Sequence, residues 1–71
     1  EARICVFHAN VPAVLSNITA EMGNRHINIE NMTNKSKGNA AYTMLDVAAA
    51  PDDATVEAIA NIEGVIRVKI V

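Results

Sequence analysis

The opening third of the chain changes from strand-like to helix-like spacing of its apolar residues. From Arg3 to Ala9, apolar residues occupy both alternating sets of positions, which predicts a central strand covered on both faces. Val14, Leu15, Ile18 and Met22 then recur at helical spacing, and they predict a helix from about Pro12 to Met22. Gly23 and Asn24 tolerate the left-handed backbone expected at the end of that helix.

The middle of the chain reads as two further strands joined by a tight turn. The segment from Arg25 to Ser36 mixes isoleucines with polar residues, which predicts an edge strand. Gly38 and Asn39 form a turn signal, and the segment from Ala40 to Val47 returns as the next strand.

The last third predicts a second helix and a last strand. Pro51 ends the preceding element, and Asp52 or Asp53 is the expected cap of the helix. Three residues form its predicted apolar face: Val56, Ile59 and Ala60. After Gly64, the segment from Val65 to Val71 alternates between charged and apolar positions, and it predicts a strand whose buried side chains are Ile66, Val68 and Ile70.

The order β-α-β-β-α-β predicts an α+β, ferredoxin-like fold, in which a four-stranded antiparallel sheet carries both helices on one face. Right-handed connections place the first and third strands in the centre and the second and fourth at the edges. Residues 1–71 are expected to form a single domain.

Composition limits how this domain is stabilised and what it binds. It has one Phe, one Tyr and no Trp, so its core must be aliphatic, and a second copy would add burial that one copy lacks. We therefore expect a homodimer formed through a sheet edge. A formal charge of −2 with no run of either sign argues against nucleic-acid and membrane partners. A single cysteine favours a cytoplasmic setting, and the start at Glu1 suggests a fragment of a longer chain.

The candidate site lies where the first strand meets the first helix. Asn10 has the side chain preferred at a helix N-cap, and Pro12 suits the first helical turn. The amides of Ala13, Val14 and Leu15 should then be open to an anion such as a carboxylate. His8 and Asn10, two residues apart on an extended segment, should project to the same side.

This segment, His-x-Asn-x-Pro-x-Val-Leu, together with the later Ile-Asn-Ile, resembles the ACT domain family. It is most similar to the C-terminal regulatory ACT domain of D-3-phosphoglycerate dehydrogenases, in which L-serine binds between two ACT domains and inhibits the attached enzyme. The resemblance implies ligand-binding roles for His8, Asn10 and Asn28. Where that family usually has glycine after the proline, this chain has Ala13.

The sequence therefore predicts an amino-acid-binding regulatory domain rather than an enzyme. The resemblance implies no cofactor in this domain and NAD in the parent enzyme. Two alternatives stay open: a dimerisation module without a ligand, consistent with Ala13, and an ACT domain of another amino-acid pathway enzyme. Other proteins of this fold fit less well, because the chain has no Cys-x-x-Cys metal motif and no arginine in the first loop for phosphoryl chemistry.

Overall fold

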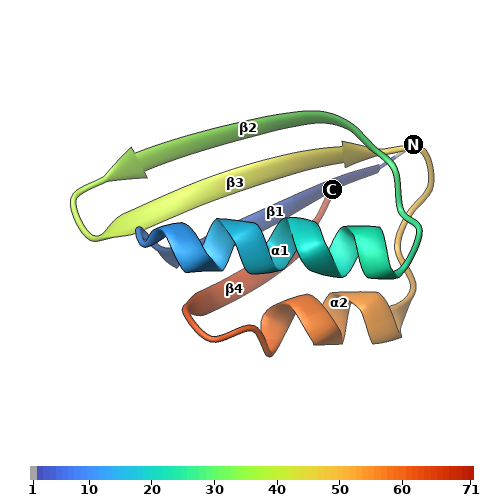
Figure 1. The fold of residues 1–71 in the computed structure, drawn as a ribbon. Coiled ribbons are helices and arrows are strands. Elements are labelled where there is room, and N and C mark those ends of the chain that lie inside the picture. Colours follow the sequence, from blue (N-terminus) through green and yellow to red (C-terminus); the bar gives the residue numbers. More distant parts are fainter. Residues whose placement is uncertain (1) are drawn as a thin grey trace.

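The computed structural model describes residues 2–71, so Glu1 lies outside the described residues. The elements follow one another as β1 (Ala2–Ala9), α1 (Pro12–Asn24), β2 (Ile29–Lys37), β3 (Ala40–Val47), α2 (Asp53–Ala60) and β4 (Val65–Ile70). The strands pair in the order β2-β3-β1-β4, and every pairing is antiparallel. The predicted ferredoxin-like βαββαβ fold is confirmed, with β1 and β3 in the centre (Figure 1).

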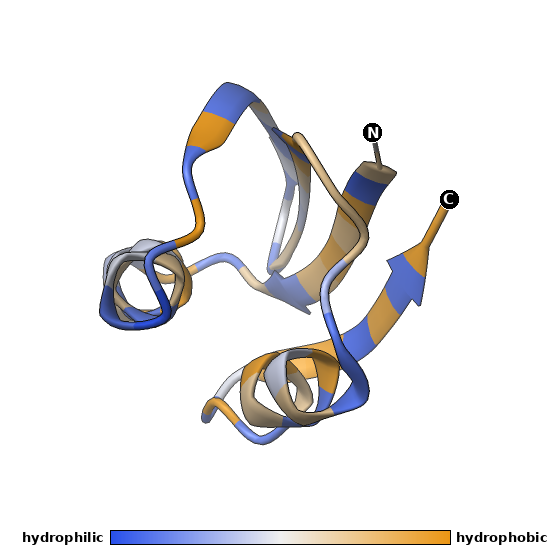
Figure 2. Cartoon of the chain, turned by 90° about the vertical axis from the view of Figure 1, so that its right-hand side faces the viewer, coloured by the Kyte–Doolittle hydropathy of each residue, from blue (hydrophilic) through white to orange (hydrophobic). Residues whose placement is uncertain are grey.

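Both helices lie on one side of the sheet, and a single aliphatic layer fills the space between. In the end-on view of Figure 2, α1 and α2 occupy the inner side of the curved sheet. The core contains eight buried residues from β1, α1, β3 and α2: Ile4, Val6, Val14, Ile18, Met22, Leu45, Val47 and Ile59. No aromatic ring belongs to this cluster, as the composition predicted.

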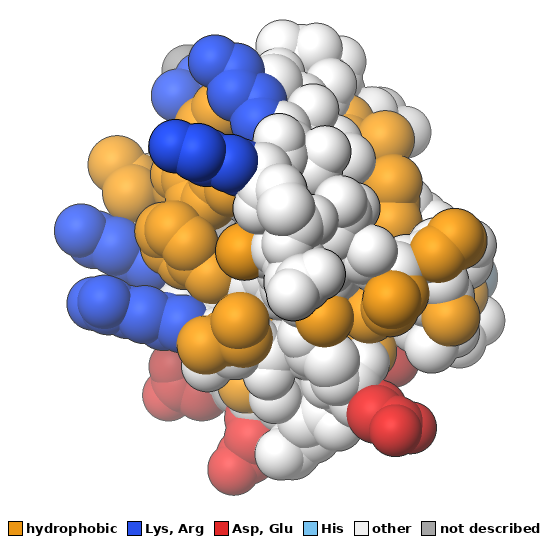
Figure 3. Space-filling view, turned by 90° about the vertical axis from the view of Figure 1, so that its left-hand side faces the viewer, with side chains coloured by type: hydrophobic (Ala, Val, Ile, Leu, Met, Phe, Trp, Pro, Cys, Tyr) orange, Lys and Arg blue, Asp and Glu red, His pale blue; other side chains and the backbone are white. Residues whose placement is uncertain are grey.

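The other face of the sheet is not covered by any element of residues 2–71, so the expectation that β1 is covered on both faces is wrong. Cys5 is 4% exposed on this face, but Phe7 is 39% exposed. The rings of Phe7 and Tyr42 pack against each other with centroids 4.5 Å apart. Figure 3 shows hydrophobic side chains on this side of the molecule between two groups of Lys and Arg.

The first helix ends later than the sequence predicted. Gly23 and Asn24 are helical, and the residue in the left-handed region is His26, with φ 59°. The amides of His26 and Ile27 donate to the carbonyls of Gly23 and Met22, at 3.1 and 2.9 Å, which is the Schellman pattern. As a result β2 begins at Ile29 rather than Arg25.

Two other predictions need correction. β4 has a bulge, because Phe7 pairs with Arg67 while the next residue, His8, pairs with Val65. The extra residue, Ile66, is 72% exposed, and Val65 packs against the core in its place. Ile70 is also exposed, at 36%, because it lies at the end of an edge strand.

The second helix has the predicted cap but a different buried face. The side chain of Asp52 accepts a hydrogen bond from the amide of Thr55 at 2.9 Å, which confirms the first of the two cap candidates. The buried residues of α2 are Thr55 and Ile59, whereas Ala60 is exposed. The helix is therefore rotated slightly from the orientation that its apolar residues alone indicate.

Replacing His26 with glycine should stabilise the domain. A left-handed backbone costs an L-residue roughly 1–2 kcal/mol, and the flexibility of glycine in the unfolded chain offsets part of that gain. We expect His26→Gly to raise the free energy of unfolding in urea by about 0.5–1 kcal/mol at a fixed protein concentration. Asn24→Gly, two residues earlier and helical, should lower it. Equal effects from the two changes would contradict this account of the helix end.

Candidate functional site

The join between β1 and α1 places the helix boundary at Val11, so the prediction of Asn10 as N-cap is wrong. Val11 has extended backbone angles, φ −131° and ψ 144°, and makes no side-chain cap hydrogen bond. The cause is Pro12 at the start of the helix, because a residue that precedes proline is sterically forced toward extended conformations. Asn10 therefore lies one residue outside the boundary.

Asn10 instead ties the first loop to the turn between β2 and β3. Its side-chain Nδ2 donates to the carbonyl of Gly38 at 3.0 Å, and its backbone amide donates to the carbonyl of Asn39 at 2.9 Å. The residue is exposed. These bonds hold a polar, accessible side chain beside the start of α1.

His8 lies inside the protein, on the helix-facing side of β1. Its exposure is 2%, and both ring nitrogens have partners within the chain. Nδ1 lies 2.8 Å from the carbonyl oxygen of Ala9, and Nε2 lies 2.7 Å from Oγ1 of Thr43. His8 and Asn10 are thus near one another in the chain, but one is buried and the other is exposed.

The first turn of α1 is partly open. The amide of Val14 donates to the carbonyl of Val11 at 3.2 Å, which engages one of the three amides expected to be free. The side chain of Val14 belongs to the core, and a Cβ added at Gly64 would lie 2.5 Å from its Cγ2. Ala13 is exposed, and Leu15 is half-buried. The turn contains no acidic residue, so nothing there neutralises the positive end of the helix dipole.

Asn28 lies at the opposite end of the sheet. It precedes Ile29, which pairs with Val47 at the end of β3, whereas His8 pairs with Ala41 near the beginning of β3. Asn28 is exposed and lines a hollow of about 520 Å³ between the end of α1 and the start of α2. Within one chain, the structure brings His8, Asn10 and the start of α1 together and leaves Asn28 apart.

Two residues near His8 were missed at the sequence level. Thr43, with no exposed surface, bonds both to His8 and, at 2.8 Å, to the side chain of Asn34 on the edge strand. The signal for Thr43 was its position among apolar residues on one face of a strand, since a buried hydroxyl requires partners. Asn34 is exposed, so nothing in its spacing distinguished it from the other asparagines nearby.

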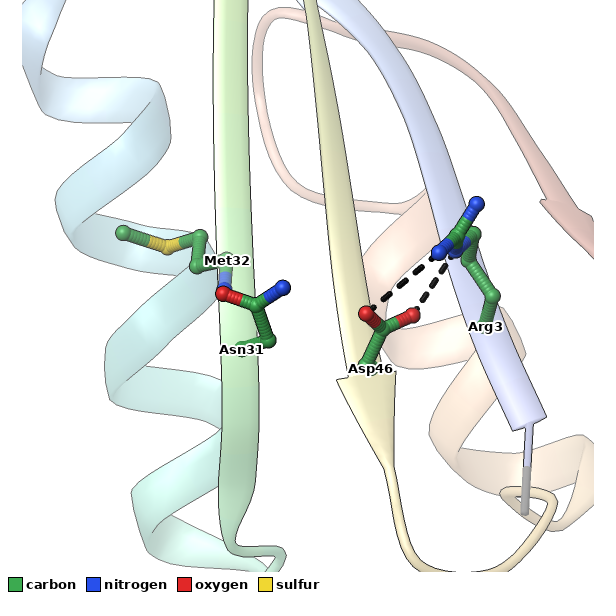
Figure 4. Close-up of polar contacts among 4 residues, drawn as sticks. All are labelled: Arg3, Asn31, Met32 and Asp46. Carbon is green, nitrogen blue, oxygen red and sulfur yellow. Dashed lines mark hydrogen bonds and ion pairs between the residues drawn. The ribbon is translucent and has the colours of Figure 1, made fainter.

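A second polar cluster lies on the uncovered face, at the other end of β1. The Arg3 side chain bonds to Asp46, with Nε 2.7 Å from Oδ1, and Asn31 lies on the next strand (Figure 4). This hydrogen bond lowers the pKa of Asp46 below its usual value. The pair borders a hollow of about 450 Å³. Because the cation is already paired, we do not assign an anion site to it.

Residues 2–71 contain no group of three or more His, Cys, Asp or Glu side chains placed to hold a metal ion. None of the helices among these residues is long and apolar enough to cross a membrane.

The fold that carries this site is that of ACT domains. The ACT domain from the GTP pyrophosphokinase of Chlorobium tepidum matches with a TM-score of 0.82 at 16% identity, over 99% of this chain and 95% of that one. An ACT domain protein from Streptococcus pneumoniae matches with a TM-score of 0.75 at 17% identity, over 99% and 85%.

A larger protein contains the same fold. The ligand-free regulatory subunit of aspartate kinase from Thermus thermophilus matches with a TM-score of 0.77 at 13% identity, and 99% of this chain covers 49% of that one. No family model matches the sequence, and no curated protein matches it. The comparisons therefore establish a shared fold.

Acid should remove the contributions of two carboxyls to stability. The pKa values of Asp46, bonded to Arg3, and Asp52, bonded to Thr55, both lie below the usual 3.8. Their contributions are present above that value and are lost as the pH falls through the lowered pKa values. Between pH 5 and 2, urea unfolding of Asp46→Asn should therefore change less than that of the original chain. Identical profiles would show that the Arg3 pair contributes nothing.

Proposed function

We propose that this chain is an amino-acid-binding regulatory domain of the ACT type, which senses L-serine for feedback inhibition of a D-3-phosphoglycerate dehydrogenase. The observation that carries the proposal is the helix start after β1. It combines a fixed, exposed Asn10 with a helix dipole that no acidic residue neutralises, on the segment that resembles those regulatory domains. A zwitterionic amino acid needs both features, because one charge must meet amides and the other an acceptor.

The residues have different roles in this proposal. The carboxylate of the ligand meets the amides near Ala13, Val14 and Leu15, while Asn10 and Asn28 bind its hydroxyl or ammonium group. His8 does not contact the ligand in this proposal, because both of its ring nitrogens already bond to the protein. Its bond to the carbonyl of Ala9 holds the backbone directly before Asn10.

A site that includes Asn28 requires a second copy of the chain. β2 is an edge strand with mostly exposed residues, so a copy can pair with it. In antiparallel pairing about a twofold axis near the middle of β2, the start of one β2 lies beside the end of the other. Asn28 of the partner subunit would then approach Gly38, to which Asn10 is bonded. Each dimer would contain two such shared sites.

The proposed setting follows from the resemblance. The parent enzyme would be cytoplasmic, would use NAD in a separate catalytic domain and would need no cofactor in this one. The resemblance thus assigns binding to this domain and chemistry to the rest of the enzyme.

One specific observation favours a second candidate, a dimerisation module without a ligand. Ala13 replaces the usual glycine at the open end of α1, and its methyl group occupies space where a ligand would approach the backbone. A third candidate is the ACT domain of another amino-acid pathway enzyme. Calorimetric titration with a panel of amino acids separates the three, since they predict serine binding, no binding, or binding of a different amino acid.

Removing the Ala13 methyl group should improve the fit of a ligand. We expect Ala13→Gly to bind L-serine more tightly than the original chain, although glycine lowers helix stability by roughly 0.5–1 kcal/mol. Calorimetry at a temperature where both proteins remain folded measures the difference. If neither protein binds any amino acid, the dimerisation module is the correct function.

Mixing two binding-site variants tests whether the site is shared. Removing one hydrogen-bond partner of a buried ligand typically costs about 1–3 kcal/mol, so Asn10→Ala or Asn28→Ala alone should weaken serine binding roughly 5- to 150-fold. A heterodimer with one change on each subunit has one intact and one doubly altered site. Titration should recover half of the original sites at full affinity.

The matched control carries the same two changes on one subunit. A heterodimer of the original chain with the Asn10→Ala, Asn28→Ala double variant has one change in each shared site, so it should show no site of full affinity. Sedimentation verifies the dimers in both cases. Two results would count against sharing: a chain that is monomeric at high concentration, and full-affinity sites in the control heterodimer.

A further inference from the structure

The only Phe and the only Tyr of the chain lie side by side on the uncovered face of the sheet. Phe7 on β1 is the direct strand partner of Tyr42 on β3, and their ring centroids are 4.5 Å apart. Phe7 is 39% exposed, Tyr42 is half-buried, and neither belongs to the core cluster. Packing of the core therefore does not explain where these rings lie, and part of their surface is open to a planar ligand.

A cation lies next to each ring, so four residues form one row across the sheet. In the strand order β2-β3-β1-β4 the row is Lys35, Tyr42, Phe7 and Arg67, because each residue is the direct strand partner of the next. Direct partners in an antiparallel sheet project to the same face. Neighbouring strands are about 4.8 Å apart, so the row spans roughly 14 Å. It presents two rings in the centre and one positive charge at each end.

Two further cations extend the charge along the edge strands. Lys37 follows Lys35 by two residues on β2, and Lys69 follows Arg67 by two residues on β4, so all four side chains project to the uncovered face. Among the described residues, none of these four takes part in an ion pair. Figure 3 shows the resulting arrangement, with Lys and Arg on two sides of the hydrophobic surface.

The positive charge of this face is local, although the whole chain has a charge of −2. Five of the six Lys and Arg residues lie on the uncovered face, and the sixth, Arg25, pairs with Glu21 of α1. On that face, Arg3 is neutralised by Asp46 at the end of β1 away from the rings. Charges further away than about 8 Å are largely screened at physiological ionic strength. A ligand at the rings therefore meets the cations of β2 and β4, and the overall charge does not exclude an anionic one.

Two shallow hollows adjoin Phe7, and each has a cation at its rim. One, of about 240 Å³, is lined by both rings and by Lys35. The other, of about 300 Å³, is lined by Phe7, Arg67 and Ile66, the residue that the bulge of β4 exposes. A flat apolar group in either hollow contacts a ring, and an anionic group attached to it meets a cation. A nucleotide has both groups, because its base is aromatic and its phosphate is charged.

We propose that the uncovered face binds a single-stranded nucleic acid, whose bases stack on Phe7 and Tyr42 and whose phosphates contact the cations of β2 and β4. RNA-recognition motifs use a four-stranded sheet in this way, with exposed aromatic residues that stack two or three bases. An acidic protein segment would be attracted by the same cations but would have no use for paired rings. The inference goes beyond the proposed function and does not depend on it, because it concerns the sheet face rather than the start of α1.

Proton NMR of the two rings reports on stacking directly, because the chain has one Phe, one Tyr and no Trp. Oligouridylate of about ten nucleotides should shift the signals of both rings, since a stacked base lies over each ring. Oligodeoxyuridylate differs only in the 2′-hydroxyl, so tighter binding of the first assigns RNA, tighter binding of the second assigns DNA, and equal binding assigns any single strand. Polyglutamate of the same length has the charge without the bases and should leave both signals unchanged.

Substitutions of Phe7 separate stacking from charge. Fluorescence anisotropy of labelled oligouridylate should show that Phe7→Leu weakens binding roughly 5- to 150-fold, which corresponds to the loss of one base–aromatic stack. Phe7→Tyr keeps a ring and should bind as tightly as the original chain. Neither change removes a charge, so the dependence of the affinity on salt should stay the same in both variants. Circular dichroism verifies that the variants are folded.

Substitutions of the cations test the phosphate contacts. The logarithm of the affinity for a single strand falls with the logarithm of the salt concentration by about 0.7 for each phosphate contact, so Arg67→Gln should reduce this slope by about 0.7. Arg25→Gln is the matched control, because it removes the same charge from the one cation outside this face. It should leave the slope and the affinity unchanged.

Three results would overturn the proposal. The first is no binding of either oligonucleotide at low salt. The second is binding of oligouridylate and polyglutamate alike, with no loss in Phe7→Leu, which would make the face a surface for an acidic protein segment. The third is an equal effect of Arg25→Gln and Arg67→Gln, which would show attraction by net charge alone. None of these results bears on amino-acid binding, which calorimetry tests separately.

Discussion

One layer of aliphatic side chains between the sheet and its helices holds this domain together, and every other feature is arranged around it. Among residues 2–71, two short helices cover one face of the sheet, and the core cluster contains Ile, Val, Leu and Met without an aromatic ring. Because this core is so thin, even small changes in side-chain volume should disturb its packing. Gly64 illustrates the point, because even one extra carbon there would collide with the Val14 side chain.

In this aliphatic layer, the buried polar residues are exceptions that need hydrogen-bond partners. His8 and Thr43 occupy positions that continue the apolar rows of β1 and β3, yet both have hydrogen-bond partners. No buried side-chain nitrogen or oxygen among the described residues lacks one. Complete pairing in so small a core indicates that the bonds from His8 to Thr43 and from Thr43 to Asn34 help to hold β1, β3 and β2 in register.

The sequence was sufficient for the architecture because element order and apolar spacing are local signals. Predictions from the sequence were wrong where contacts with residues distant along the chain determine the local structure. Nothing in the last segment predicted the bulge that exposes Ile66, since the bulge arises from pairing with β1. His26 took the left-handed position expected of glycine because the helix continued through Gly23.

For the candidate site too, the sequence predicted the features that adjacent residues determine and missed those that depend on contacts between strands. The sequence located the loop, the proline and the open helix turn, all of which are adjacent along the chain. It could not predict that His8 turns inward to Thr43, because those residues are 35 positions apart. Nor could it distinguish Asn34 from its neighbours, since the only difference is a bond to a residue on another strand.

The uncovered face of the sheet has a consequence for assembly. Phe7 and Tyr42 lie there between strands that carry Lys35 and Arg67, on the side away from the acidic residues of α2. A dimer built through β2 would leave this surface free on both subunits and align the two copies in one plane. The pair would then carry its Lys and Arg side chains mainly on the sheet side and its Asp and Glu side chains mainly on the helical side, so the small net charge of −2 arises from two faces of opposite charge.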